Sequence, residues 1–331
     1  MRCGVVGAGA WGTALADLLA RNGHDVMLWA FEPEVAESIE ARHENELFLR
    51  GLALHPTLGA TSDLRAALRD RELVLFATPS SHLRALAQRA AGATRQDATI
   101  AVATKGIEAG TLALMTDVAD AELPGRPVVA LSGPSFAAEV AAGEPTAVVA
   151  ASTELSAALC VQEVLSNASF RVYTNDDVRG VELGGALKNV MAVATGICEG
   201  LGLGHNTRAA LITRGLAEMT RLGVALGARP ATFAGLAGMG DLVLTCTGAL
   251  SRNRAVGVEI GQGRSLDEAL QGKHTVAEGV HTTRSAHALA ERVGVEMPIV
   301  RMVTRILFEG QSPRDGIAEL MTRELRAERD R

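Results

Sequence analysis

The chain begins with a short apolar segment that leads directly into a glycine-rich turn, Gly7-Ala-Gly-Ala-Trp-Gly12. Residues 3–6 have the composition of a buried β-strand, and residues 13–21 have helical spacing. In such a strand–turn–helix unit, glycines permit a tight turn and close approach of the backbone to a pyrophosphate, for which the helix N-terminus supplies amide donors. The turn therefore predicts a dinucleotide-binding α/β domain with Gly7, Gly9 and Gly12 at the cofactor. The alternative is a glycine-rich turn without a ligand.

The hydrophobic pattern changes near residue 177. Before this point, short β-like runs alternate with helical stretches, which is typical of βαβ units and a mostly parallel sheet. After it, the strand signals cease and helical patterns continue. A chain of 331 residues is long enough for two domains. The sequence therefore predicts an α/β protein with an N-terminal Rossmann-type doubly wound sheet, residues 1–177, that binds a dinucleotide. An all-helical C-terminal domain, residues 178–331, is expected to bind substrate and carry the catalytic residues.

The individual elements follow from the same periodicities. Strands are expected at residues 3–6, 26–29, 73–77, 99–103, 128–131, 147–150 and 170–173. Helices are expected at residues 13–21, 83–91, 155–165, 178–199, 207–226, 251–262, 265–270, 282–292, 299–308 and 318–328.

Composition limits the classes of partner and the compartment. The chain has 38 acidic and 32 basic residues and a net charge of −6, which argues against nucleic acid and anionic membranes as partners. Its four cysteines are far apart and form no Cys-x-x-Cys pair, so we expect no disulfide framework and no metal site. We see no cationic leader followed by an apolar targeting segment, and no apolar run that approaches a membrane span. We therefore expect a cytoplasmic protein without an integral membrane segment.

The preference between NAD and NADP depends on the end of the second expected strand. A ribose-binding acid is expected about twenty residues after the glycine-rich turn, and Glu32 lies at that distance from Gly12. Residues 26–41 contain no arginine to bind a 2′-phosphate, although Arg42 or Arg50 could fold back. The alternative for Glu32 is an acid in the first turn of a helix, where acids are favoured. The pattern favours NAD.

Lys188 is the only ionisable side chain between Gly184 and Gly196, in a stretch dominated by glycine, alanine, valine, leucine and methionine. Such residues let neighbouring elements approach closely and leave little room for water. Desolvation makes an ammonium easier to deprotonate, which suits acid–base work near neutral pH. The alternative is a lysine that snorkels from an otherwise buried helix. This stretch alone does not distinguish the two.

Three further stretches are candidates for binding an anionic substrate. Lys105 follows an expected strand, at the carboxyl end of the sheet where ligands bind. Ser135 follows a strand and a Gly-Pro turn, at a helix start whose amides and hydroxyl suit a polar ligand. Asp241 follows Gly-Met-Gly, and Arg252 with Asn253 offers N–H donors suited to a phosphate. Each residue taken singly has an alternative as a loop lysine, a helix cap or a surface charge.

Six motifs occur in order between residue 5 and about residue 280. They are Gly-x-Gly-x-Trp-Gly, Lys105-Gly106, Ser132-Gly-Pro-Ser135, Gly185-Ala-Leu-Lys-Asn189, Gly240-Asp241 and Ser251-Arg-Asn-Arg254. Together they resemble the NAD(P)-dependent glycerol-3-phosphate dehydrogenases of bacterial type. The resemblance implies an oxidoreductase that uses NAD or NADP to interconvert dihydroxyacetone phosphate and sn-glycerol 3-phosphate for glycerophospholipid synthesis.

The resemblance also assigns roles to residues. It identifies Lys188 as the proton donor and acceptor, and we expect Lys105 and Asp241 to assist it. It implies substrate contacts for Lys105, Gly133, Ser135, Asp241, Ser251, Arg252 and Asn253. It implies dinucleotide contacts for Ala10, Trp11, Lys105, Ala137, Arg252, Val276 and Glu278. We also expect Asn189, beside Lys188, and Thr245, one helical turn after Asp241, to face the substrate.

Two departures from the family pattern and two alternative functions accompany the resemblance. Phe31 occupies a position that is often basic, which agrees with a preference for NAD, while Phe48 and Arg50 stand where Tyr and Pro are usual.

One alternative function is that of a β-hydroxyacid or 6-phosphogluconate-type dehydrogenase, which shares a Rossmann half, a helical half and a lysine on the connecting helix. The other is a non-catalytic dinucleotide-binding protein on the same fold. Ample apolar residues in the helical half favour a homodimer.

Overall fold

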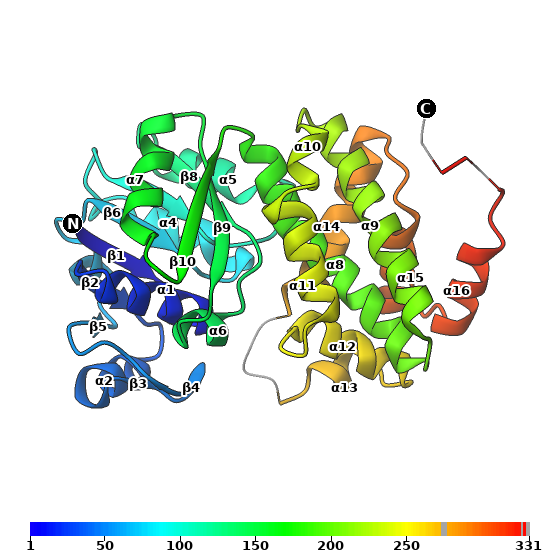
Figure 1. Ribbon diagram of the computed structural model, residues 1–331, viewed down its shortest axis with the longest axis horizontal. Coiled ribbons are helices and arrows are strands. Elements are labelled where there is room, and N and C mark those ends of the chain that lie inside the picture. Colours follow the sequence, from blue (N-terminus) through cyan, green and yellow to red (C-terminus); the bar gives the residue numbers. More distant parts are fainter. Residues whose placement is uncertain (273–276, 326, 329–331) are drawn as a thin grey trace.

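The computed structural model describes residues 1–272, 277–325 and 327–328, and it consists of an α/β half and a helical half (Figure 1). The described part of the α/β half contains an eight-stranded sheet in which neighbouring strands are parallel, except for one antiparallel pair, β8 with β9. In spatial order the strands are β10 (Phe170–Asn175), β9 (Thr146–Ala151), β8 (Val128–Ser132), β7 (Thr99–Val102), β6 (Leu73–Phe76), β1 (Arg2–Val6), β2 (Asp25–Trp29) and β5 (Gly59–Thr61). The predicted fold class is confirmed.

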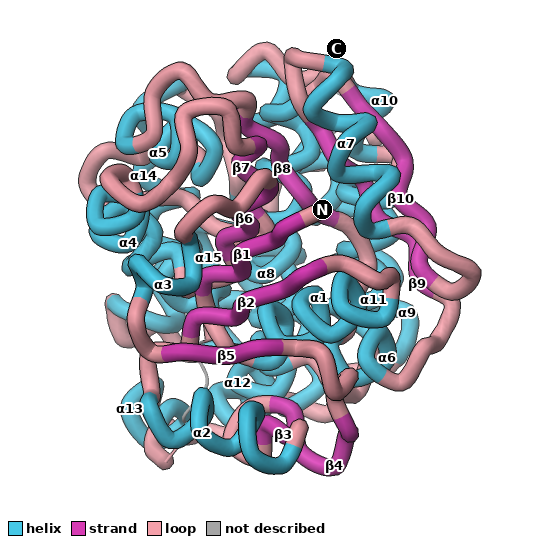
Figure 2. Tube along the Cα trace, turned by 90° about the vertical axis from the view of Figure 1, so that its left-hand side faces the viewer, coloured by secondary structure: helices cyan, strands magenta, loops and turns pink. Residues whose placement is uncertain are grey.

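Helices cover both faces of the sheet (Figure 2). One face packs against α1 (Ala10–Arg21), α6 (Ala137–Ala141) and α7 (Leu155–Leu165). The other face packs against α3 (Leu64–Leu68), α4 (Leu83–Ala90) and α5 (Met115–Glu122). Central strands therefore bury side chains on both sides, as all four residues of β6 do. This explains why these strands are continuous apolar runs in the sequence.

The expected strands are confirmed to within two residues at each end, but several short elements were not predicted. In the α/β half these are β3 (Glu44–Asn45), β4 (Leu49–Ala53), β5, α2 (Pro33–Arg42), α3, α5 and the 3-10 turn η1 (Ser80–His82). In the helical half they are α10 (Pro230–Phe233), the π-helical turn η2 (Leu236–Gly240) and α11 (Asp241–Thr247). The helix expected to start near Ser135 is present as α6. Most of the unpredicted elements are short, and β4 exposes most of its residues, so neither its length nor its hydrophobic pattern distinguishes it from a loop.

The expected helix at residues 318–328 was placed wrongly. The structure has α16 at Pro313–Met321. Ser312 caps this helix by accepting a hydrogen bond from the Asp315 amide, and Pro313 stands in its first turn, where proline is favoured. The described residues beyond Met321 are exposed and have no core against which a helix could pack.

The helical half is built around one long buried helix. This helix, α8 (Val178–Gly200), has every side chain from Leu183 to Cys198 buried. Around it lie α9 (His205–Ala225), α10 (Pro230–Phe233), the π-helical turn η2 (Leu236–Gly240), α11 (Asp241–Thr247), α12 (Arg252–Gly261), α13 (Leu266–Leu270), α14 (Glu278–Val293) and α15 (Pro298–Phe308). A central helix that is apolar all round is expected to be buried in this way.

The length and composition of α8 are sufficient for a membrane span, contrary to the expectation that no apolar run approaches that length. Its most apolar 18-residue window has a mean hydropathy of 1.2, and all of that window is buried inside the protein. Core helices of globular proteins have the same composition, so the hydropathy of α8 follows from its packing.

The backbones of α8 and α12 are in direct contact through glycines. A Cβ atom on Gly196 would lie 2.1 Å from the Arg254 carbonyl oxygen, and one on Gly257 would lie 2.2 Å from that of Val193. One turn further along each helix, Gly200 and Gly261 would overlap the partner backbone in the same way. Because residues four apart lie on one helix face, the glycines form facing rows that set the distance between the two helices.

We expect Gly257→Ala to destabilise the protein by about 2 kcal/mol, because overlap with backbone costs about 3 kcal/mol and alanine regains roughly 1 kcal/mol of helix propensity. Chemical denaturation followed by circular dichroism measures this change. Gly92→Ala is the matched control, since no atom lies within 4 Å of the added methyl group. Equal stability of the two variants would show that the close contact is not required.

Candidate functional site

Three turns at the carboxyl ends of β6, β7 and β8 meet the helical half. They contain Ser80, Lys105 and Gly133. The first two turns are tied together by Thr104, whose hydroxyl donates to the Thr78 carbonyl at 2.9 Å and accepts from the Thr78 amide at 3.2 Å. Because parallel strands bring their carboxyl ends to one edge, residues far apart in the sequence converge there.

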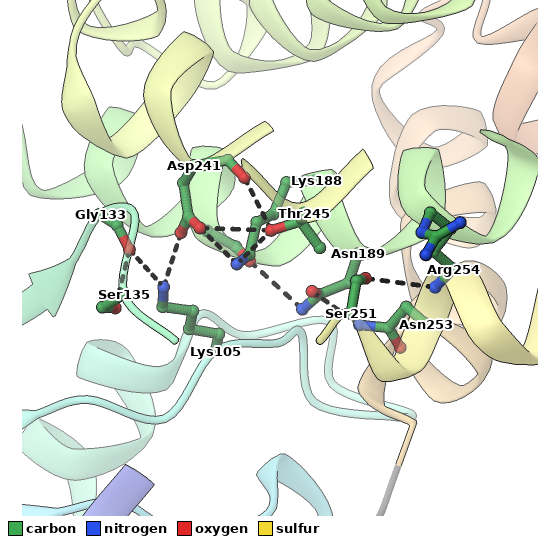
Figure 3. A network of polar contacts seen from close by, with 11 residues as sticks. Lys105, Gly133, Ser135, Lys188, Asn189, Asp241, Thr245, Ser251, Asn253 and Arg254 are labelled. Carbon is green, nitrogen blue, oxygen red and sulfur yellow. Dashed lines mark hydrogen bonds and ion pairs between the residues drawn. The ribbon is translucent and has the colours of Figure 1, made fainter. Parts of the chain in front are cut away.

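Lys188, Asp241 and Lys105 form a continuous charged network (Figure 3). The Lys188 ammonium donates to Asp241 Oδ1 at 2.5 Å, and the Lys105 ammonium donates to Asp241 Oδ2 at 2.6 Å. Lys188 also donates to the Thr245 hydroxyl at 2.9 Å, and that hydroxyl donates to the Asp241 carbonyl at 2.7 Å. Asp241 is fully buried and Lys188 is 8% exposed, so Lys188 does not snorkel to solvent.

The surroundings of Lys188 lower its pKa from the usual lysine value to about 8. Burial is the largest cause, because an ammonium loses its hydration, and repulsion by Lys105 acts in the same direction. The attraction of Asp241 opposes both and keeps the pKa from falling further. A lysine with this pKa can both donate and accept a proton near neutral pH.

Gly133 and Ser135 lie on the α/β side of this network. Gly133 has a φ of +137°, and a Cβ atom there would lie 2.9 Å from the Val148 backbone, so glycine is required. Its carbonyl accepts hydrogen bonds from the Lys105 ammonium at 3.1 Å and from the Ser135 hydroxyl at 3.0 Å. The turn thus orients Lys105 and places Ser135 beside it.

The start of α12 lies on the other side of Lys188. Ser251 caps this helix by accepting from the Arg254 amide. The Asn253 side chain donates to Asn189 Oδ1 at 2.9 Å and accepts from the Gly279 amide at 2.9 Å. The structure therefore uses Asn253 and Asn189 to join α12, α8 and α14, rather than leaving both amides free for a ligand.

Arg252 has no hydrogen-bond or ion-pair partner among the residues that the structure describes. Arg252 remains in contact with solvent. The surrounding protein nevertheless removes part of the hydration of its guanidinium, which lowers the pKa of Arg252. The nearby Glu278 carboxylate opposes this shift. An unpaired arginine at a helix N-terminus is well suited to bind a phosphate.

The glycine-rich turn has the form required for a dinucleotide. Gly7 has a φ of +111°, and a Cβ atom on Gly12 would lie 1.9 Å from the Gly7 carbonyl oxygen. Gly9, at the N-cap of α1, faces open space. The Trp11 indole nitrogen is buried and has no hydrogen-bond partner within the described chain. A buried donor of this kind requires an acceptor, so these residues fit a bound dinucleotide.

The remaining cofactor candidates are distributed around this turn. Ala137 begins α6, which packs against α1. Glu32 stands at the N-cap of α2 without making a side-chain capping bond. Glu278 lies at the start of α14 and accepts hydrogen bonds from Ser80, a residue that the sequence did not single out. Ser80 follows a strand at the ligand-binding edge of the sheet, and this position was the sequence signal that could have identified it. Val276 lies outside the described residues.

The turn after β2 exposes an aromatic side chain. Phe31 is 73% exposed and contacts Trp29 edge to face. Arg42, considered above as a ligand for a 2′-phosphate, donates instead to Ser38 at 2.9 Å within α2. Arg50 is exposed on β4. Among the described residues, no arginine directly follows β2.

Comparison with known proteins covers both halves of the chain. Family models for the N-terminus and the C-terminus of NAD-dependent glycerol-3-phosphate dehydrogenase match residues 2–158 and 177–318. Proteins named glycerol-3-phosphate dehydrogenase (NAD(P)+) are similar to it: one from Geobacter sulfurreducens is 56% identical over 99% of both chains. Another from Citrifermentans bemidjiense is 55% identical over 98% of both.

A crystal structure of glycerol-3-phosphate dehydrogenase from Coxiella burnetii is also similar. It has a TM-score of 0.94 and 43% sequence identity, covering 97% of this chain and 99% of that one. One family matches both halves, which excludes the alternative of a β-hydroxyacid or 6-phosphogluconate-type dehydrogenase. The chain belongs to the NAD-dependent glycerol-3-phosphate dehydrogenase family.

Proposed function

We propose that the protein catalyses the NAD(P)H-dependent, reversible reduction of dihydroxyacetone phosphate to sn-glycerol 3-phosphate, with Lys188 as general acid and base. Its relatives are named glycerol-3-phosphate dehydrogenase (NAD(P)+), and the proposed reaction is such a dehydrogenation in reverse. The observation that carries the role of Lys188 is its buried ammonium, which is held by Asp241 between a dinucleotide-type turn and the start of α12. A protein that only binds a dinucleotide gains nothing from this arrangement, because burying charges costs free energy.

The dinucleotide supplies the hydride when it is bound. As the hydride reaches carbon, the carbonyl oxygen of the substrate gains negative charge, which the Lys188 ammonium stabilises before it donates a proton. Asp241 and Thr245 hold the Lys188 nitrogen in place. Lys105, oriented by Asp241 and the Gly133 carbonyl, adds positive charge for the anionic substrate. In the reverse reaction, the neutral Lys188 amine accepts the hydroxyl proton.

Arg252 and the first amides of α12 are proposed to bind the substrate phosphate. Ser251 fixes the start of this helix, and the helix dipole favours an anion there. Asn253 and Asn189 tie this helix start to the residue that follows Lys188. Binding energy from the phosphate, remote from the reacting carbon, can then align the carbonyl with Lys188.

We further propose that residues 1–177 form the dinucleotide-binding domain and residues 178–331 the substrate-binding and catalytic domain. Asp177 supports this boundary. Its carboxylate caps α8 by accepting from the Gly180 amide at 3.0 Å, and it accepts from the Arg229 amide at 2.8 Å. It thereby fixes the point at which the chain enters the helical half.

We propose that the protein acts in the cytoplasm as a homodimer. Four free cysteines agree with a reducing cytoplasm. Exposed Val224, Met239, Val243 and Leu250 offer apolar surface on the helical half for a homodimer. In this setting the glycerol 3-phosphate formed would supply glycerophospholipid synthesis.

Lys188→Met is expected to reduce the rate of dihydroxyacetone phosphate reduction by about 10²–10⁴-fold, the usual contribution of a general acid. NADH oxidation measured by absorbance tests this, while NADH fluorescence measures dinucleotide affinity, which is expected to stay within about threefold. Lys188→Arg keeps the positive charge, but an arginine does not release a proton near neutral pH. If Lys188→Arg retains full turnover, Lys188 is not the proton donor.

The reaction rate is expected to depend on pH through Lys188. Because the ammonium is the acid in reduction, kcat should fall as pH rises through about 8, and glycerol 3-phosphate oxidation should rise through the same value. Asp241→Asn removes the charge that raises the Lys188 pKa, so both profiles should move to lower pH. Profiles that remain in place in Asp241→Asn would assign the titration to another group.

We propose that the protein prefers NAD, because apolar Phe31 and acidic Glu32 follow β2 where a 2′-phosphate would need a cation. Phe31→Arg is therefore expected to lower the KM for NADPH by roughly tenfold, the value of one added charged hydrogen bond. Phe31→Gln is the uncharged control, and it should change the KM for NADPH and the KM for NADH by less than this. A wild-type protein with a lower KM for NADPH than for NADH would contradict this preference.

A further inference from the structure

Arg252 and Glu278 are neighbouring, oppositely charged residues that do not form an ion pair in the structure. Each immediately precedes one partner of the hydrogen bond between the Gly279 amide and Asn253 Oδ1, which is 2.9 Å long. That bond holds the first turns of α12 and α14 together, beside the Asn253–Asn189 contact seen in Figure 3. No ion pair within 4.0 Å involves Arg252 in the described part of the chain.

The Glu278 carboxylate is occupied by Ser80 instead. The Ser80 amide donates to Glu278 Oε1 at 3.1 Å, and the Ser80 hydroxyl donates to Glu278 Oε2 at 2.6 Å. Ser80 is only 7% exposed. The turn after β7 packs against it so closely that a Cβ atom on Gly106 would lie 2.6 Å from Ser80 Cβ. Ser80 is therefore fixed in position and points both of its donors at one carboxylate.

We propose that Ser80 is a positioning residue that holds the Glu278 carboxylate away from Arg252 and so keeps the guanidinium free for the substrate phosphate. The Glu278 carboxylate is near enough to Arg252 to oppose the lowering of its pKa by burial, and an arginine and a carboxylate free to approach each other form a strong charge-assisted pair. A phosphate would then have to displace that pair before it could bind. The inference rests on the phosphate-binding role proposed above for Arg252.

This arrangement also lessens the repulsion between Glu278 and a bound phosphate. Two donors on the carboxylate stabilise its negative charge on the side that faces the α/β half. The hydrogen bonds between Ser80 and Glu278 join the two halves of the protein, since Ser80 follows β6 and Glu278 begins α14.

The test measures the KM for dihydroxyacetone phosphate and the competitive inhibition constant, Ki, of inorganic phosphate. Ser80→Ala frees one Glu278 oxygen and is expected to raise both constants roughly three- to tenfold, with kcat changed less than twofold. Ser80→Thr, which keeps the hydroxyl, should restore both. The matched control is Ser81→Ala, because Ser81 is exposed and its side chain makes no hydrogen bond within the described structure. This variant should change neither constant.

A double mutant separates this mechanism from general damage to the site. Glu278→Gln removes the competing charge, so it should not raise the phosphate Ki, and adding Ser80→Ala to it should have no further effect on that constant. An unchanged phosphate Ki in Ser80→Ala, or an equal rise with and without Glu278→Gln, would overturn the inference. If Ser80→Ala does not fold, a raised phosphate Ki in Glu278→Gln alone would overturn it.

Arg252→Ala distinguishes the failure of this inference from failure of the underlying role. It should raise the phosphate Ki by at least tenfold if Arg252 binds the phosphate. An unchanged Ki would remove the phosphate role and the inference together. A raised Ki in Arg252→Ala with no change in Ser80→Ala would leave the phosphate role in place and remove only the inference.

Discussion

One buried carboxylate, that of Asp241, determines how the two halves of the protein meet. It accepts from Lys105 in the α/β half and from Lys188 in α8, and it is fully buried. A buried charge without a partner costs several kcal/mol, so the turn after β7, α8 and α11 must converge on this carboxylate. The cofactor turn and the start of α12 are both placed relative to that point. The geometry of the site is thus a consequence of satisfying one charge.

The balance of forces on Lys188 explains why a shared carboxylate suits proton transfer. Burial alone would favour a neutral amine, which has no proton to donate to a carbonyl oxygen. If Asp241 were paired with Lys188 alone, its attraction would hold the ammonium proton of Lys188 too tightly for release near neutral pH. Burial and, to a lesser extent, repulsion by Lys105 oppose the attraction of Asp241, and the pKa of Lys188 is lowered to about 8. Lys105 therefore lowers the pKa of Lys188 in addition to its proposed role in attracting the substrate.

Some residues of the candidate site are identifiable from the sequence because their signals are local. Lys188 is recognisable as an isolated charge in an apolar helix, and Lys105 as a cation at the end of a strand. The pairing of Asp241 with both depends on contacts between residues 136 and 53 positions apart, which no local pattern encodes. The hydrogen bond between Ser80 and Glu278 joins residues 198 positions apart and was not predicted, for the same reason. Likewise, buried β6 was predicted from its apolar run, whereas β4, mostly exposed, was not.

The glycine contact between α8 and α12 has a functional consequence beyond stability. It brings the two backbones so close that Asn253, at the start of α12, reaches Asn189 on α8. Asn189 directly follows Lys188, so the proposed phosphate-binding end of α12 is held at a fixed separation from the proposed proton donor. A larger residue at Gly257 would move α12 outward and separate the two. The small residues in α8 thus serve two needs: they bury Lys188, and they bring the proposed phosphate site within reach of the same substrate molecule.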